Sequence, residues 1–170
     1  MHIGQGAPLT IIAGPCVLES KSLCEEVAGT LKGICEEAGV NFVFKGSFDK
    51  ANRTSIHSKR GPGIENGLAI LKEIQTSMSV PVTTDIHEPH QATEIGNVVD
   101  IIQIPAFLCR QTDLLVSAAS TGKIVNVKKG QFLSPQEMSH VINKLIEANC
   151  NGFMLTERGT FFGYSRLVND

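Results

Sequence analysis

The order of apolar segments along the chain is the feature that most limits what it can fold into. Short apolar runs alternate with longer segments in which apolar residues recur at helical spacing. The runs, which we predict to be strands, are 9–13, 40–44, 80–84, 98–104, 124–127 and 152–155. The predicted helices are 19–38, 64–78, 90–97, 110–121 and one that begins at Ser134–Pro135, while a sixth has barely begun at Asp170. Strict alternation of this kind predicts a parallel sheet flanked by helices.

Three of the predicted helices have a clear apolar face, which should pack against the sheet. The three faces are Leu23, Val27, Leu31, Ile34 and Ala38; Ile64, Leu68, Leu71 and Ile74; and Met138, Val141, Ile142, Leu145 and Ile146. Gly39 follows the first helix and is a typical C-terminal stop. Cys24, Cys35 and Cys150 are interpreted as inert helix or core thiols.

Two α/β folds fit this alternation, and chain length and strand exits favour different ones. A (β/α)8 TIM barrel typically needs about 250 residues, so 170 residues favour an open doubly wound sheet. The strand exits favour the barrel, because a barrel carries its active site around the carboxyl ends of successive strands. Reactive or polar groups follow each strand: Cys16 and Glu19, Lys45, Asp85 and His87, Gln103 and Arg110, Lys128, and Arg158. We therefore predict one incomplete barrel domain over 1–170, with about six of the eight strand–helix units.

Composition and charge exclude several other classes of protein. A hydrophobic content of 42% is enough for one sizeable core. We expect neither a membrane span nor secretion, because the chain has no apolar run of about 18 residues and no signal pattern at its start. The five cysteines form no Cys-x-x-Cys pair, which disfavours a disulfide framework and fits a reducing cytoplasm. A net charge of −2 argues against a nucleic-acid partner.

One loop concentrates positive charge in an otherwise acidic chain. Residues 45–60 contain five basic side chains and a single acid, although the whole chain has a net charge of −2. Hydroxyl and amide groups lie between the cations, and this mixture suits phosphate and carboxylate ligands. A solvated basic turn and a nucleic-acid patch are the alternatives. The loop follows a predicted buried strand and leads into a Gly-Pro-Gly helix entry, and this placement favours a ligand site.

Six motifs together closely resemble the 3-deoxy-D-manno-octulosonate 8-phosphate synthases, also called the 2-dehydro-3-deoxyphosphooctonate aldolase family. The motifs lie, in the family's order and spacing, at 14–20, 44–55, 84–88, 103–113, 126–132 and 157–164. The related 3-deoxy-D-arabino-heptulosonate 7-phosphate synthases rank second. They share the Gly-Pro-Cys start but carry Lys-Pro-Arg-Thr-Ser-Pro where this chain has Lys50-Ala-Asn-Arg-Thr-Ser55.

The resemblance implies a tetrameric cytoplasmic (β/α)8 barrel enzyme, a transferase of lipopolysaccharide biosynthesis. Its reaction condenses phosphoenolpyruvate with arabinose 5-phosphate and water and releases inorganic phosphate. Carried over by position, Lys45, Lys50, Gln103, Lys128 and Arg158 would contact phosphoenolpyruvate, with the backbone N–H of Ala106 and the flanking Pro105 and Phe107. Asn52, Arg53, Thr54 and Arg110 would contact the sugar phosphate.

Catalysis would fall to Asp85 and His87 near the reacting carbons and water, together with Lys45. The reaction needs a proton acceptor near the water and a proton donor near the aldehyde oxygen, and the sequence leaves open which residue does which. Structural interpretations exist for the same residues. Asp85 could cap the following helix, His87 could be an ordinary loop histidine, and Arg158 could pair with Glu157 on the surface.

Cys16 places the chain on the metal-dependent side of the resemblance, because metal-independent members carry asparagine at this position. A thiolate with imidazole and carboxylate ligands suits zinc, iron or manganese. The resemblance puts the other three ligands, a histidine, a glutamate and an aspartate, beyond the sixth strand and outside this chain. We therefore expect a chain truncated at its C-terminus and inactive alone, with a non-catalytic phosphosugar-binding fragment as the alternative.

Overall fold

The computed structural model describes residues 2–169, which form two compact units. The first unit ends at Thr84, and the second begins at Asp85. Each unit contains parallel strands that alternate with helices, as the sequence predicts. That residues 1–170 form a single domain stays a prediction.

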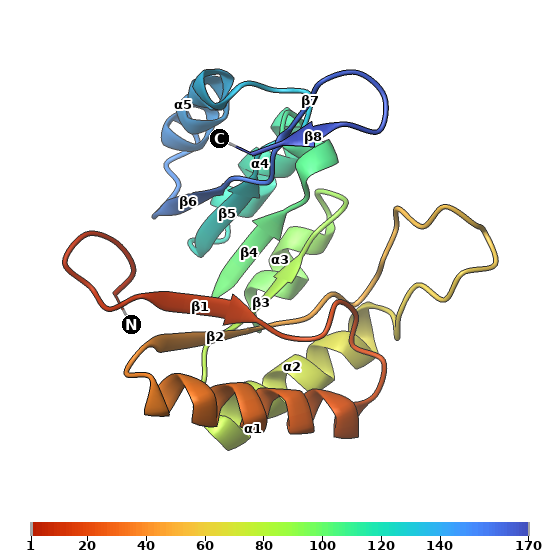
Figure 1. The fold of residues 1–170 in the computed structure, drawn as a ribbon, viewed down its shortest axis with the longest axis vertical. Helices are drawn as coiled ribbons and strands as arrows, with labels where there is room; N and C mark the ends of the chain where they lie inside the picture. The colour runs from red at the N-terminus through yellow and green to blue at the C-terminus, as the bar shows by residue number, and fades with distance from the viewer. Residues whose placement is uncertain (1, 170) are drawn as a thin grey trace. The chain divides into compact units, whose positions relative to one another are not determined.

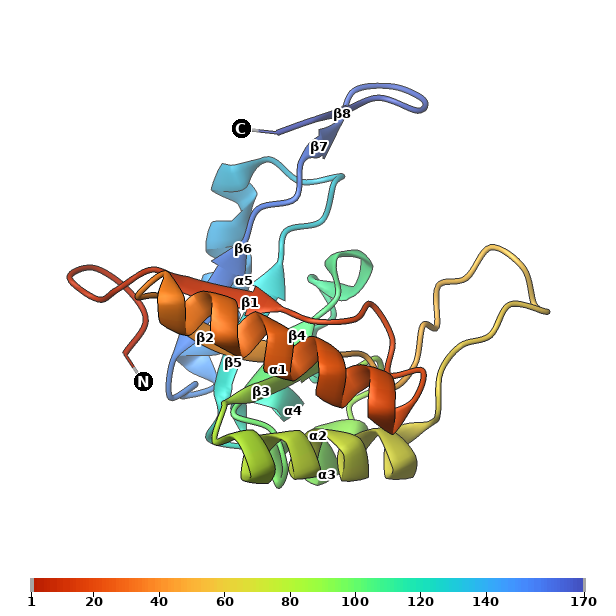
Figure 2. The ribbon, with the colours of Figure 1, turned by 60° about the horizontal axis from the view of Figure 1, so that its bottom comes forward.

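The first unit contains three parallel strands and two helices (Figure 1). In chain order they are β1 (Thr10–Ala13), α1 (Lys21–Glu37), β2 (Asn41–Lys45), α2 (Ile64–Met78) and β3 (Val82–Asp85). β1 pairs with β2 and β2 pairs with β3. Figure 2 shows α1 and α2 side by side on the same side of β1 and β2.

The second unit continues the alternation and then departs from it. Its elements are α3 (Gln91–Gly96), β4 (Ile101–Ile104), η1 (Ala106–Leu108), α4 (Thr112–Ala119), β5 (Ile124–Lys128), η2 (Pro135–Glu137), α5 (Met138–Glu147), β6 (Phe153–Thr156), β7 (Thr160–Phe161) and β8 (Leu167–Val168). β4, β5 and β6 are parallel neighbours, whereas β7 and β8 form a short antiparallel hairpin. The helices α3, α4 and α5 contact one another in chain order.

The strand order in each unit is the one that a barrel requires, because each strand of a barrel lies beside the next one in sequence. In each unit the strands follow the chain, β1-β2-β3 in the first and β4-β5-β6 in the second. The prediction of an α/β fold that forms part of a (β/α)8 barrel is confirmed.

The cores of both units consist of strand residues and the apolar faces of the helices. In the first unit Phe44, Leu71 and Ile74 are fully buried. In the second unit every residue of β4 is buried, as is typical of a parallel strand covered on both faces. The predicted face of α5 is confirmed for Met138, Val141 and Leu145 but not for Ile146, which is 58% exposed.

The predicted apolar face of α1 is displaced by one residue. Leu23 and Ile34 are 37% and 56% exposed, whereas Cys24 and Ala28 are fully buried. The helical period is correct, but the phase is wrong, because small side chains occupy the side of the helix that packs closely against its neighbours. A cysteine thiol behaves as a small hydrophobe in such positions.

The segment after β6 contains a hairpin that the sequence did not predict, while the sixth helix predicted to begin at Asp170 falls outside the described residues. Among residues 157–169, the ordered elements are β7 and β8, and Asp170 itself lies outside the described residues. Gly159 and Gly163 have positive φ angles of 87° and 76°, which interrupt helical geometry. None of the helices within residues 2–169 combines the length and hydropathy needed to cross a bilayer.

Candidate functional site

In the first unit, the exits of β1 and β2 lie against each other. Lys45 is the last residue of β2 and is half-buried. A Cβ atom added to Gly14 would lie 2.0 Å from the main-chain oxygen of Lys45, so only glycine permits this approach. The turn that leads to Cys16 is therefore fixed beside the end of the strand that carries Lys45.

The buried Ser47 organises the base of the basic loop, which we define as residues 45–63. Its main-chain oxygen accepts the N–H of Leu18 at 3.0 Å, and its hydroxyl accepts from Lys50 Nζ at 3.0 Å. The N–H of Lys50 also donates to the oxygen of Arg60 at 2.7 Å. Lys50 is thus held at the base of the loop, near the end of β2.

The tip of the basic loop is exposed and contains all three residues assigned to the sugar phosphate in this unit, Asn52, Arg53 and Thr54. Arg53 Nε donates to the oxygen of Lys59 at 3.3 Å. Arg60 instead forms an ion pair with Asp49, and the Asp49 carboxylate raises the pKa of the guanidinium. Because the charges of Arg60 and Asp49 cancel, the positive potential of the loop comes from its other basic side chains.

In the second unit, Asp85 and His87 come together at the end of β3. Asp85 is 6% exposed, and its Oδ2 atom lies 3.3 Å from His87 Nε2. The main-chain N–H groups of His87 and Glu88 both donate to Gln91 Oε1, at 2.8 and 3.2 Å, so the Gln91 side chain holds the backbone that follows Asp85. An acid and an imidazole in contact can transfer protons to and from a bound substrate.

Polar side chains continue from this pair across β4 and β5. The N–H of Ile86 donates to the main-chain oxygen of Gln103 at 3.1 Å. Gln103 is 4% exposed and is in register with Asn126 of β5, so their side chains share one face of the sheet. Asn126 Oδ1 in turn accepts from the Thr156 hydroxyl at 2.8 Å. The interior face of this unit is therefore polar near the ends of its strands.

The segment after β4 holds four predicted site residues at different depths. Pro105 precedes η1, and Ala106, its first residue, is buried. Phe107 is 54% exposed, and Arg110 is exposed on the surface. Arg110 also lines a pocket of about 230 Å³ with Leu133, Glu137, His140, Val141 and Lys144.

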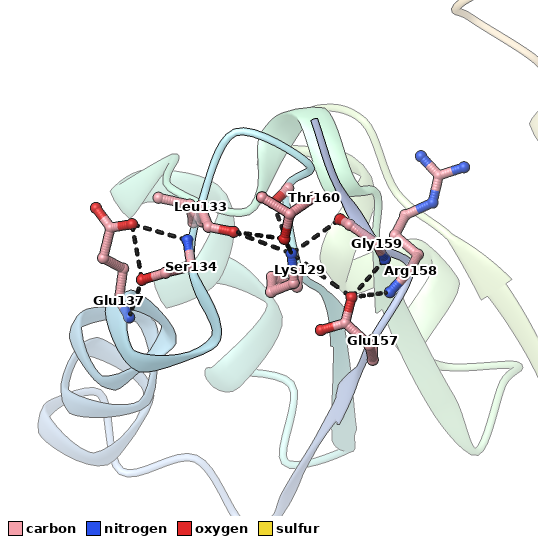
Figure 3. Close-up of polar contacts among 9 residues, drawn as sticks. Lys129, Leu133, Ser134, Glu137, Glu157, Arg158, Gly159 and Thr160 are labelled. Carbon is pink, nitrogen blue, oxygen red and sulfur yellow. Dashed lines mark hydrogen bonds and ion pairs between the residues drawn. The ribbon is translucent and has the colours of Figure 1, made fainter. Parts of the chain in front are cut away.

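Lys128 and Arg158 follow two neighbouring strands. Lys128 ends β5 and is in register with Thr156, the last residue of β6. Arg158 lies two residues further on and is exposed, and its guanidinium points away from Glu157 in Figure 3. Glu157 pairs instead with Lys129, at 3.6 Å between Oε1 and Nζ. The alternative of a surface pair between Arg158 and Glu157 is therefore wrong.

The sequence interpretation missed Lys129, Asn126 and Ser47, which are all buried polar residues. Asn126 had a visible signal, because it interrupts the apolar run Ile124–Val127 just as Gln103 interrupts the run before Pro105. Lys129 had no such signal in the sequence. It stands beside Lys128, and a pair of lysines at a strand end usually indicates two solvated cations.

The predicted metal site is represented here by Cys16 alone, whose thiol is exposed. Within residues 2–169 no group of three histidine, cysteine, aspartate or glutamate side chains is placed to hold a metal ion. The described residues do not form a metal site by themselves. Metal dependence stays a prediction.

Fold and site together define an α/β-barrel protein with cationic and acid–base groups at the carboxyl ends of its strands. The family model of the DAHP synthetase I family matches residues 1–170. The chain belongs to this family.

Curated relatives agree with the resemblance found in the motifs. A 2-dehydro-3-deoxyphosphooctonate aldolase from Desulfatibacillum aliphaticivorans is 56% identical over 170 residues, covering 100% of this chain and 62% of that protein. Proteins with the same name from Desulfotalea psychrophila and Fusobacterium nucleatum are 58% and 56% identical, over 99% and 94% of this chain and 60% and 58% of theirs. The resemblance is confirmed, and the seven-carbon alternative is not favoured. The chain spans about three-fifths of the length of these relatives.

Proposed function

We propose that the protein containing this chain condenses phosphoenolpyruvate with D-arabinose 5-phosphate and water. The products would be 3-deoxy-D-manno-octulosonate 8-phosphate and inorganic phosphate, so the protein would be a transferase of lipopolysaccharide biosynthesis. The observation that carries the proposal is the 56–58% identity to aldolases of this name over nearly the whole chain. The positions of the cations and of the Asp85–His87 pair support it.

The substrates explain why cations gather at the strand ends. Both are phosphorylated, and phosphoenolpyruvate carries a carboxylate as well, so they repel each other unless the protein neutralises their charge. Lys45 and Lys128 are the last residues of β2 and β5, and Lys50 and Arg158 lie in the segments that follow β2 and β6. Positioning and charge neutralisation together lower the barrier to a reaction between two anions.

The chemical steps assign a role to the Asp85–His87 pair. C3 of phosphoenolpyruvate forms a bond with the aldehyde carbon, whose oxygen takes up a proton. Water adds at C2 and loses a proton, and the C2–O bond to phosphate then breaks as the new C2 hydroxyl gives up its proton, which leaves a ketone and releases inorganic phosphate. Asp85 and His87, 3.3 Å apart, are suited to accept the water proton and to supply the other one.

The finer properties implied by the resemblance are also proposals. They are a homotetramer, a cytoplasmic location, and a divalent zinc, iron or manganese ion with Cys16 among its ligands. The donor chemistry of a thiol suits these ions. Elemental analysis of the full natural protein, compared with its Cys16→Ser variant, tests the metal proposal: a metal content that the substitution leaves unchanged contradicts it.

The choice of acceptor sugar tests the main proposal. The full natural protein should release phosphate from phosphoenolpyruvate with arabinose 5-phosphate and form an eight-carbon product, identified by its mass. A four-carbon aldose phosphate would give a seven-carbon product and should be a poor acceptor. Preference for the four-carbon sugar would favour the heptulosonate alternative. Phosphate-sugar binding without turnover would favour the non-catalytic one.

A further inference from the structure

Lys129 is a buried cation outside the predicted set of site residues. It directly follows Lys128, the last residue of β5, but only 2% of Lys129 is exposed whereas Lys128 is half-buried. Successive residues of an extended chain point to opposite sides. Burying an ammonium group is costly unless it is hydrogen-bonded and paired, so its partners identify what it does.

The Lys129 ammonium is surrounded by oxygen atoms from two different loops (Figure 3). From the loop after β5, the oxygens of Leu133 and Gly130 accept at 3.0 and 3.4 Å. From the segment after β6, the oxygen of Gly159 and the hydroxyl of Thr160, the first residue of β7, lie at 2.9 and 3.0 Å. Three ammonium hydrogens face these four oxygens, and so the group is fully satisfied.

The Glu157 carboxylate extends this arrangement to the backbone of Arg158. Its Oε1 atom lies 3.6 Å from Lys129 Nζ and accepts the N–H groups of both Arg158, at 2.8 Å, and Gly159. Burial alone would raise the pKa of Glu157, but the Gly159 N–H, the Lys129 charge and the Arg158 N–H outweigh it and lower this pKa. Glu157 therefore remains a carboxylate that links Lys129 to the turn containing Arg158.

We propose that Lys129 is a positioning residue, which fixes the turn 157–160 so that Arg158 presents its guanidinium to the phosphate-bearing substrate. This inference rests on the proposed function, because it assigns Arg158 to phosphoenolpyruvate. Lys129 does not contact the substrate itself. The Lys129 ammonium is bound by protein oxygens, whereas the exposed Arg158 points away from the Lys129 cluster (Figure 3).

Lys129→Met in the full natural protein tests the proposal, since methionine fills a similar volume without charge or donors. The amides of residues 158 and 159 should exchange hydrogen at least about tenfold faster in the variant. KM for phosphoenolpyruvate should rise about tenfold to hundredfold, the scale of a misplaced positioning group. KM for arabinose 5-phosphate should change less than about twofold, because none of the Lys129 contacts involves the sugar-phosphate residues.

Two further variants keep the test decisive. Lys123→Met, immediately before the first residue of β5, is the matched control and should leave both exchange and KM unchanged. Thr160→Val removes one oxygen from the cluster and should change the same quantities in the same direction by a smaller factor. If Lys129→Met does not fold, Thr160→Val decides the matter.

The possible failures are distinguishable. A wild-type protein that does not turn over phosphoenolpyruvate contradicts the proposed function, and the assignment of Lys129 to this substrate falls with it. An active wild type whose variants keep normal amide exchange, or keep a normal KM for phosphoenolpyruvate, overturns the positioning role and leaves the proposed function intact. Equal changes in both KM values also overturn it, because they indicate a general loss of structure.

Discussion

The ammonium of Lys144 donates to the main-chain oxygen of Arg110 at a distance of 2.9 Å and to the Thr112 hydroxyl at 2.8 Å. Lys144 belongs to α5, whereas Thr112 is the first residue of α4 and Arg110 lies two residues before it. The contact therefore fixes the segment from which the Arg110 side chain extends. As in the Lys129 cluster, a lysine outside the predicted site residues supports the segment that carries an arginine assigned to a substrate.

We predict that Lys144→Met weakens the use of arabinose 5-phosphate more than that of phosphoenolpyruvate. Loss of two hydrogen bonds of about 1 kcal/mol each should raise KM for the sugar phosphate by up to about thirtyfold. KM for phosphoenolpyruvate should stay within about twofold. Steady-state kinetics of the full natural protein with each substrate varied in turn measures both values. An unchanged KM for the sugar phosphate would mean that Arg110 does not need this support.

Asp85→Asn should abolish most turnover while phosphoenolpyruvate still binds. The substitution keeps the shape of the side chain but removes its basicity, and general acid–base catalysis contributes about 10²- to 10⁴-fold. We expect kcat to fall by at least about a hundredfold, with the affinity for phosphoenolpyruvate within a few-fold of normal by calorimetry. Asp113→Asn, an exposed acid in the first turn of α4, is the control. Retained turnover in Asp85→Asn would transfer the proton roles to other groups.

Gly159→Ala should destabilise the turn after β6. Its φ angle is 87°, and an added Cβ would lie 2.7 Å from Asn169 Oδ1 and 2.8 Å from Leu167 Cγ. Backbone strain and the clash together should lower the free energy of unfolding by about 2 kcal/mol or more. Gly163→Ala is the matched control, because Gly163 has a φ of 76° but no atom within 4 Å of the added Cβ. Equal midpoints of thermal unfolding for the two variants would exclude the clash as a cause.

The lowered pKa of Glu137 predicts how the stability of the fold depends on pH. The N–H and hydroxyl of Ser134 are the main causes that lower the pKa of Glu137, and the charges of Arg110 and His140 assist them. A carboxyl group whose pKa is lower in the folded state stabilises the fold above its unfolded pKa of about 4.3. This contribution is lost as the pH falls through the lower, folded value.

Glu137→Gln should therefore cost stability at neutral pH and very little at the acid end of that window. Denaturant unfolding of the full natural protein at several pH values measures the difference from wild type. Glu147→Gln, at the other end of α5, is the control for a general effect of charge. A difference that does not shrink as the pH falls would show that the Ser134–Glu137 contact does not depend on ionisation.

Local signals in the sequence were sufficient for most of the fold. Alternating runs specified the three parallel strands of each unit, and Ser134–Pro135 marked the start of the η2–α5 segment, where Ser134 and Glu137 form a capping box. The phase of α1 could not be obtained in this way. Leu23 and Cys24 are both apolar, and only tertiary packing decides which of them faces inward.

The candidate site was predictable where a residue's role follows from its own place in the chain. Lys45 and Lys128 are the last residues of their strands. Asp85 is the last residue of β3, and His87 lies two residues beyond it. The role of Lys129 depends on oxygens contributed by a loop about thirty residues further along, which no local pattern specifies. The hairpin of β7 and β8 was missed for a related reason, because its strands are too short to produce a period.

The base of the basic loop has a consequence for how such proteins can diverge. Phe48 and Gly61 are in close approach, since a Cβ on Gly61 would lie 2.3 Å from the Phe48 oxygen, and the Lys50–Arg60 hydrogen bond closes the stem just inside them. Residues 51–59, which lie between Lys50 and Arg60, form the tip of the loop and extend from this closed stem. The tip can therefore be lengthened, shortened or exchanged while Lys45 and Lys50 keep their places. The proposed sugar-phosphate contacts of this unit, Asn52, Arg53 and Thr54, all lie in this tip, so a change of acceptor sugar can be accommodated here without moving Lys45 or Lys50.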